Sequence, residues 1–144
     1  NSICFSPDGA TMYYCNSPDR AIRCCDYDVT TGAISNDRVF AVLDGDAGEP
    51  DGSCIDADGH LWNAQWGASR VVRYTPGGKV ERMIETAARQ PSCVAIGGPD
   101  MATLFVTSAR VGMSAPAVHD GALFHQKLTD ARGLNESRFR LAVL

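Results

Sequence analysis

Three segments of the chain repeat one pattern, in which a short apolar stretch, a tight turn and a second apolar stretch follow one another. The repeats begin at Asn1, Asp51 and Ser92, and their turns carry Asp-Gly or Pro-Asp. Asp-Gly between apolar stretches is a strong hairpin signal, because Gly adopts positive φ at little cost and Asp bonds to its own backbone. The repeat therefore predicts three hairpins that start in equivalent ways.

Further strands follow each hairpin. Third strands are predicted at residues 21–27, 70–74 and 121–125, and more polar fourth strands at 33–42 and 79–84. Four strands per repeat, with repeats starting roughly 40 to 50 residues apart, is typical of β-propeller blades. We predict an all-β chain of three four-stranded blades, at residues 1–49, 50–90 and 91–144, the last of them irregular because 129–144 holds no clear fourth strand. The alternative is an antiparallel sandwich, which has no need to repeat one turn three times.

Three blades are fewer than the four to eight of a closed propeller. An open arc exposes apolar faces and strand edges at both ends. We therefore expect the chain to be half of a larger propeller, or to be completed by a second copy. A two-fold homodimer would place three blades from each chain around one axis, and two-fold dimers are the commonest symmetric assembly.

Charge and cysteine usage exclude several classes of function. The chain has 13 Lys and Arg against 17 Asp and Glu, a net charge of −4, which argues against nucleic-acid binding. No apolar run approaches the roughly 20 residues of a membrane helix. The six cysteines form no CxxC pair and do not have the spacing of zinc ligands, so we expect them to be reduced. Because no leader is seen either, we expect a cytoplasmic location. Cys4, Cys54 and Cys93 lie in apolar runs and are expected to be buried.

The starts of the repeats are the candidate site. The innermost strand of a propeller blade starts near the central axis, so Asn1, Asp51 and Ser92 are expected to converge there. Asn1 precedes Asp8, and Asp51 precedes Asp58, by the same seven residues. A carboxylate beside an amide oxygen suits a hard cation such as calcium, and zinc also accepts Asp oxygen. The alternative is that residues 50–52, Pro-Asp-Gly, form only a loop turn; both interpretations stay open on spacing alone.

A set of motifs matches a known family in order and spacing. They lie at residues 1–9, 27–36, 50–59, 61–67, 70–73 and 97–110, and the likeness runs continuously from residue 1 to about residue 126. With these motifs the chain resembles the C-terminal half of the senescence marker protein/gluconolactonase/regucalcin-like family. The resemblance implies a six-bladed β-propeller that hydrolyses sugar lactones, or in some members organophosphates, with one divalent cation.

The same resemblance implies roles for two residues. Asn1 matches the Asn that opens an inner strand and binds the family's cation, and Asp51 matches the Asp ligand that is also the proposed general base. The family's Glu ligand and its substrate-binding Arg and Asn belong to the N-terminal half. The implied mechanism is cation-assisted lactone hydrolysis, in which the cation polarises the carbonyl and Asp51 takes a proton from the attacking water.

Loops on the face of Asp51 hold two candidate substrate contacts. Trp66 is a candidate wall of a sugar pocket, or it packs between blades. Arg110 is a candidate contact for an acidic sugar, or it forms a solvated or inter-blade ion pair. We therefore keep two hypotheses for the function. The first is a sugar-lactone hydrolase, present here as its C-terminal half, with a sugar lactone as substrate and calcium or zinc as cofactor. The second is a non-catalytic half-propeller that serves in binding or assembly.

Overall fold

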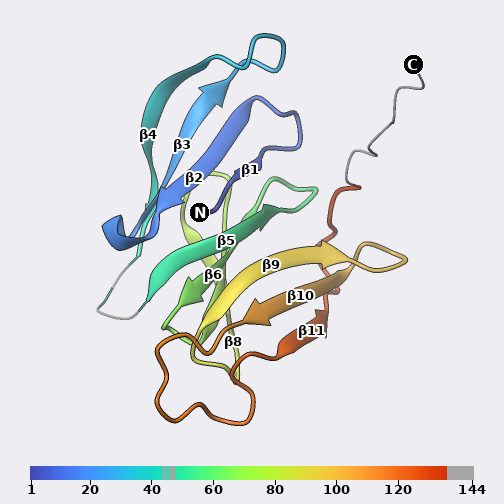
Figure 1. Ribbon diagram of the computed structural model, residues 1–144. Coiled ribbons are helices and arrows are strands. Elements are labelled where there is room, and N and C mark those ends of the chain that lie inside the picture. Colours follow the sequence, from blue (N-terminus) through green and yellow to red (C-terminus); the bar gives the residue numbers. More distant parts are fainter. Residues whose placement is uncertain (44, 46–47, 136–144) are drawn as a thin grey trace, which may run out of the picture.

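The computed structural model describes residues 1–43, 45 and 48–135 and shows three antiparallel sheets in chain order (Figure 1). The first sheet comprises β1 (Cys4–Phe5), β2 (Thr11–Asn16), β3 (Ala21–Tyr27) and β4 (Ile34–Val42), with a short 3-10 helix η1 (Ser17–Asp19) between β2 and β3. The second comprises β5 (Glu49–Ile55), β6 (Leu61–Trp66), β7 (Arg70–Tyr74) and β8 (Val80–Glu85). The third comprises β9 (Pro91–Gly97), β10 (Thr103–Ser108) and β11 (Leu123–Lys127). The predicted all-β partial propeller is confirmed.

The third sheet has three strands in its described part, where the repeat predicted four. After β11 the chain crosses back to the second sheet instead of adding a strand. Gly133 forms an isolated antiparallel bridge with Asp56, and the amide of Ala57 donates to the carbonyl of Arg132 at 2.8 Å. Residues 136–144, which our third blade range includes, lie outside the described residues, and the blade boundaries stay our assignment.

The sheets pack face to face, so the core lies between blades rather than inside any one of them. One apolar cluster joins the first two sheets: Tyr13, Ile22, Cys24, Ala41, Leu43, Ile55, Leu61, Val72 and Tyr74. The other joins the second and third sheets: Trp62, Ala64, Val71, Val94, Ile96, Leu104, Val106, Leu128 and Ala131. Strand β6 is buried on both faces because alternate side chains point to opposite neighbours. Its polar residues Asn63 and Gln65 are therefore buried too.

The first strands of the sheets lie side by side. Strand β5 contacts both β1 and β9 (Figure 1). Strands β4 and β8 are the last in the order of their sheets, at the edges opposite β1 and β5. This order brings the starts of the three repeats to one end of the molecule, as a propeller predicts. The outermost strands of the terminal sheets expose apolar side chains, with Ile34 61% and Leu123 63% exposed.

The structure tests the predictions for the cysteines and for membrane-spanning helices. All six cysteines are free, as predicted. Cys4, Cys54 and Cys93 were expected to be buried, but Cys4 and Cys54 are half-buried and Cys93 is exposed. Among the described residues, no helix is long and apolar enough to cross a membrane.

Candidate functional site

Asp51 lies on a β-bulge at the start of β5. Pro50 pairs with Gln65 and Ser53 pairs with Asn63, so Asp51 and Gly52 form an extra step in the ladder. Bulges of this kind turn a side chain out of the regular alternation and occur beside active sites. The Pro-Asp-Gly segment is thus a local irregularity within a strand, and it presents the Asp51 carboxylate at the inner end of the second sheet.

Gly52 allows the third sheet to approach this bulge closely. A Cβ atom at position 52 would lie 2.5 Å from the Sγ atom and 2.8 Å from the Cα atom of Cys93. Only a residue without a side chain fits at that distance. Gly52 therefore sets how near the inner strand β9 comes to β5.

Asn1 lies next to the same bulge, as the repeat predicted. Its Nδ2 atom donates to the Ser17 hydroxyl at 2.8 Å, and that hydroxyl donates to the carbonyl of Pro50 at 2.7 Å. The side chain of Asn1 is exposed, and no described residue donates a hydrogen bond to its Oδ1 atom. One amide oxygen and one carboxylate are therefore available at this end of the inner strands.

The surroundings of Asp51 shift the pKa of its carboxyl upward. Partial burial raises the pKa of the Asp51 carboxyl above its ordinary value, while the amino group of Asn1 acts in the opposite direction. A carboxylate with a raised pKa accepts a proton from water more readily at neutral pH than an exposed one does.

A buried polar cluster lies beneath the bulge. Its members are Ser2, Ser53 and Asn63, and Ser2 is 2% and Asn63 0% exposed. The Ser2 hydroxyl donates to the backbone carbonyl of Asp51 at 2.6 Å, and Asn63 Nδ2 donates to the same carbonyl at 3.1 Å. The sequence reasoning missed this cluster. The repeat held one signal, since Ser2 takes the place that Gly52 has in the second repeat.

Ser92, the third convergent position, is placed differently. Strand β9 has its own register irregularity here, since Cys93 pairs with Thr107 and Pro91 with Ser108. The Ser92 hydroxyl lies 2.9 Å from the hydroxyl of Thr107 and is hydrogen-bonded to it. It is engaged within its own sheet.

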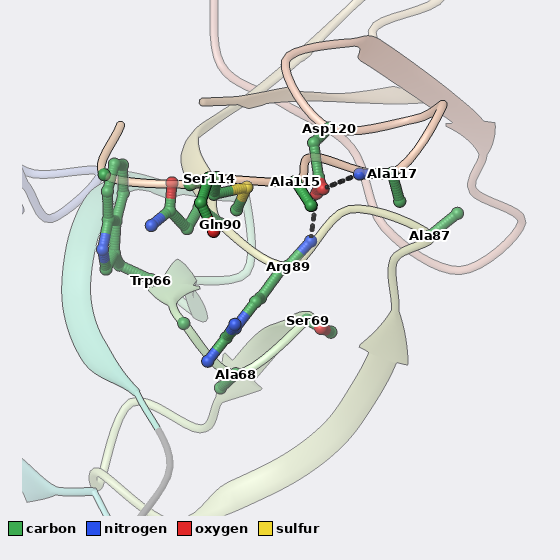
Figure 2. Close-up of a pocket in the computed structure, with 13 residues that line it drawn as sticks. Trp66, Ala68, Ser69, Ala87, Arg89, Gln90, Ser114, Ala115, Ala117 and Asp120 are labelled. Atoms are coloured by element: carbon green, nitrogen blue, oxygen red, sulfur yellow. Dashed lines mark hydrogen bonds between the residues drawn. The ribbon is translucent and has the colours of Figure 1, made fainter. Parts of the chain in front are cut away.

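An open cavity of about 830 Å³ lies at the same end of the sheets (Figure 2). It is formed by the β6–β7 turn, the β8–β9 connection and the long β10–β11 loop. Trp66 lies at its edge, outside both apolar clusters, and pairs in the ladder with Glu49, two residues before Asp51. Trp66 lines this cavity, and its contact with a sugar stays a prediction.

The loop over this cavity is held by Asp120, a buried carboxylate. Its two oxygens accept from the backbone amides of Arg89 and Ala117, both at 2.8 Å (Figure 2). These N–H groups hold the pKa of Asp120 below its ordinary value. Local sequence patterns do not reveal Asp120 or Arg89, because their contact joins residues 31 positions apart.

Arg110 forms a hydrogen bond within the β10–β11 loop. Its Nε atom donates to the carbonyl of Asp120 at 2.6 Å, and its stem packs on Gly121. Arg110 does not line the cavity, whereas Arg89 does. A contact between Arg110 and substrate stays a prediction.

The described residues contain no group of three or more His, Cys, Asp and Glu side chains arranged to hold a metal ion. That Asn1 and Asp51 bind a cation stays a prediction. Both donate oxygen, which is the donor that calcium requires and that zinc accepts.

Residues 1–110 match the SMP-30/Gluconolactonase/LRE-like region. The chain belongs to this family. Among its relatives, L-arabinolactonase of Azospirillum brasilense is 48% identical over 143 residues, covering 96% of this chain and 46% of the relative. The 6-deoxy-6-sulfogluconolactonase of Pseudomonas putida is 38% identical over 125 residues, covering 85% of this chain and 42% of the relative.

A solved structure shows the same fold. The crystal structure of a calcium-binding protein, regucalcin, from Agrobacterium tumefaciens is 37% identical, with a TM-score of 0.89 over 98% of this chain and 49% of that one. The chain thus spans about half the length of these relatives. The family membership and the half-propeller fold inferred from the motifs are both confirmed.

Proposed function

We propose that this chain forms one half of a cation-dependent sugar-lactone hydrolase. The observation that carries the proposal is the Asp51 carboxylate, raised on a bulge beside the exposed amide of Asn1 at the inner ends of the sheets. Relatives named as lactonases support the reaction class, and they support a sugar lactone as the substrate.

Asn1 and Asp51 are the residues that would hold a divalent cation, calcium or zinc. The name of the regucalcin relative, a calcium-binding protein, supports calcium. Calcium takes six to eight oxygen ligands, so the remaining ligands come from water, substrate or chain beyond these residues. A bound cation supplies Lewis-acid chemistry, which polarises the lactone carbonyl and makes a coordinated water more acidic.

Asp51 acts as the general base in this proposal. Water adds to the carbonyl carbon of the lactone, and Asp51 takes the proton that the water loses. The ring C–O bond then breaks, and the ring oxygen receives a proton to give the open hydroxy acid. Partial burial of Asp51 supports this role, because its raised pKa makes it a better proton acceptor.

Trp66 is the proposed contact for the sugar. Its indole borders the cavity close to the bulge and offers an apolar face to a sugar ring. Arg110 steadies the loop over that cavity, and this supports an indirect part in substrate binding in addition to the direct contact first considered.

A second candidate is a non-catalytic module for binding or assembly. The exposed apolar side chains of β4 and β11 favour it, because such surfaces occur where another molecule packs. A homodimer that completes six blades would satisfy both candidates. We also propose a cytoplasmic location, which the free cysteines support.

The test combines mass, cation binding and turnover on one sample. Light scattering gives the oligomeric mass, calorimetric titration gives calcium and zinc affinity, and glucono-1,5-lactone hydrolysis is measured above its spontaneous rate. Asp51→Asn is expected to abolish cation binding and turnover, whereas Asp58→Asn, an exposed turn carboxylate, leaves both unchanged. Equal cation affinity in the native chain and Asp51→Asn contradicts the proposal.

A further inference from the structure

The hydroxyl of Ser2 has one proton, and its surroundings decide where that proton goes. The single proton of the Cys15 thiol has a nearer acceptor in the carbonyl of Pro50, at 3.3 Å, than in Ser2 Oγ, at 3.4 Å. Ser53 Oγ donates to Ser2 Oγ at 2.9 Å, and Asn63 Nδ2 donates to it at 3.2 Å. These donors occupy the acceptor side of the hydroxyl. Its proton is therefore directed to the carbonyl of Asp51, 2.6 Å away.

The backbone of Ser2 is in a conformation that is strained for a residue with a side chain. Ser2 has φ of +59°, in the left-handed region where glycine is favoured. Glycine would relieve that strain but would carry no hydroxyl. A strained residue at a candidate site, buried and fully hydrogen-bonded, indicates that the side chain has a task there.

The hydrogen bond from Ser2 to the carbonyl of Asp51 also joins the first sheet to the second at the bulge. Ser2 lies just before β1 of the first sheet, and its hydroxyl donates to the carbonyl of Asp51 in the bulge of the second sheet. Ser17 makes a parallel contact from the first sheet to the carbonyl of Pro50 at 2.7 Å. Successive carbonyls of the bulged segment are thus held by side chains from the neighbouring sheet.

We infer that Ser2 is a positioning residue that holds the bulge of Asp51 at a set distance from Asn1. This inference rests on the proposed function for its consequence, which is cation affinity, although the clamp itself does not require a cation. Residues that orient metal ligands typically change metal affinity by 10- to 100-fold when they are replaced.

Ser53 supplies a matched control. It belongs to the same buried cluster, where it donates to Ser2 Oγ and accepts from Asn63 Nδ2 at 2.9 Å, but it makes no hydrogen bond to Asp51. Ser53→Ala therefore removes polar contacts from the cluster and leaves the clamp in place. Ser2→Gly removes the clamp and relieves the strained backbone, so its folding is favoured while its positioning is lost.

The experiment measures two quantities on the native chain, Ser2→Gly and Ser53→Ala. The first is the ¹⁵N order parameter of the Asp51 and Gly52 amides without cation, and the second is calcium affinity by calorimetry. In Ser2→Gly we expect the order parameter to fall from about 0.85 toward the mobile range below about 0.6. We expect calcium affinity to fall about 10-fold or more. Ser53→Ala should leave both near the native values.

The two hypotheses fail separately. A Ser2→Gly chain whose Asp51 and Gly52 amides stay as rigid as the native ones overturns the clamp. Loss of rigidity in Ser53→Ala equal to that in Ser2→Gly also overturns it, because the role is then one of general packing. If the native chain binds no calcium, the cation part of the proposed function fails, and the order parameters alone decide the clamp.

Discussion

Replacing Gly52 by Ala tests the packing that positions Asp51. The new Cβ atom would meet three atoms of Cys93, Sγ at 2.5 Å, Cβ at 2.7 Å and Cα at 2.8 Å. A backbone atom cannot rotate away, so β5 and β9 must separate at their inner ends. The bulge that carries Asp51 moves with them.

The expected magnitude follows from two opposing effects. Overpacking of a well-filled site costs about 1–3 kcal/mol, and the contact with Cα places this case at the upper end. Gly to Ala also stabilises by about 0.4–1 kcal/mol, because the unfolded chain loses conformational freedom. We therefore expect a net loss of about 2 kcal/mol, which lowers Tm by about 4–8 °C in a domain of this size.

Gly97→Ala is the control for this prediction. Gly97 also lies in an inner strand, but a Cβ atom there would lie 3.7 Å from Phe105 Cε2, an ordinary contact. This variant is expected to equal or exceed the native chain in stability. Urea unfolding monitored by tryptophan fluorescence gives both free energies. Equal stability of Gly52→Ala and Gly97→Ala would refute the argument.

Three further predictions concern the loop, the middle sheet and the cavity. Backbone N–H groups hold the pKa of Asp120 below its ordinary value. The ionised carboxylate therefore stabilises the loop above the pKa of Asp120 in the unfolded chain, and this stabilisation is lost as pH falls through its pKa in the folded chain. Hydrogen exchange of the loop amides should accelerate as pH falls through this range, and Asp120→Asn should remove that pH dependence. Arg73→Met should cost about 3–5 kcal/mol in urea unfolding, because Asp56, 0% exposed and 2.6 Å from the guanidinium, would lose its charged partner. Trp62→Ala should cost about 3–5 kcal/mol from the core, whereas Trp66→Ala should cost about 1 kcal/mol or less and raise KM for a sugar lactone.

Each of these has a result that contradicts it. Loop amide exchange with the same pH dependence in Asp120→Asn as in the native chain would show that another group governs the loop. An Arg73→Met chain as stable as one lacking the exposed Arg38–Asp26 pair would show that burial adds nothing at Asp56. An unchanged KM in Trp66→Ala would remove Trp66 from the substrate site.

Much of the architecture could be predicted from local patterns. The Asp-Gly turns required glycine at positive φ, and Gly9 and Gly59 have φ of +74° and +80°. The alternation of apolar residues located the strands, because side chains two apart share one face of a sheet. The shared spacing before Asp8 and Asp58 placed Asn1 and Asp51 at equivalent points, and the family motifs added their proposed chemistry.

Other features were decided by contacts between residues distant in the sequence. The close approach of Cys93 to Gly52, the hydrogen bond from Ser2 to Asp51 and the caps on Asp120 all cross between sheets or loops. Local propensity carries no information about such pairs, because their partners are chosen by how the sheets pack. The sequence by itself determined the strands, the turns and the candidate ligands, whereas only the packing of one sheet on the next determined how Asp51 is held.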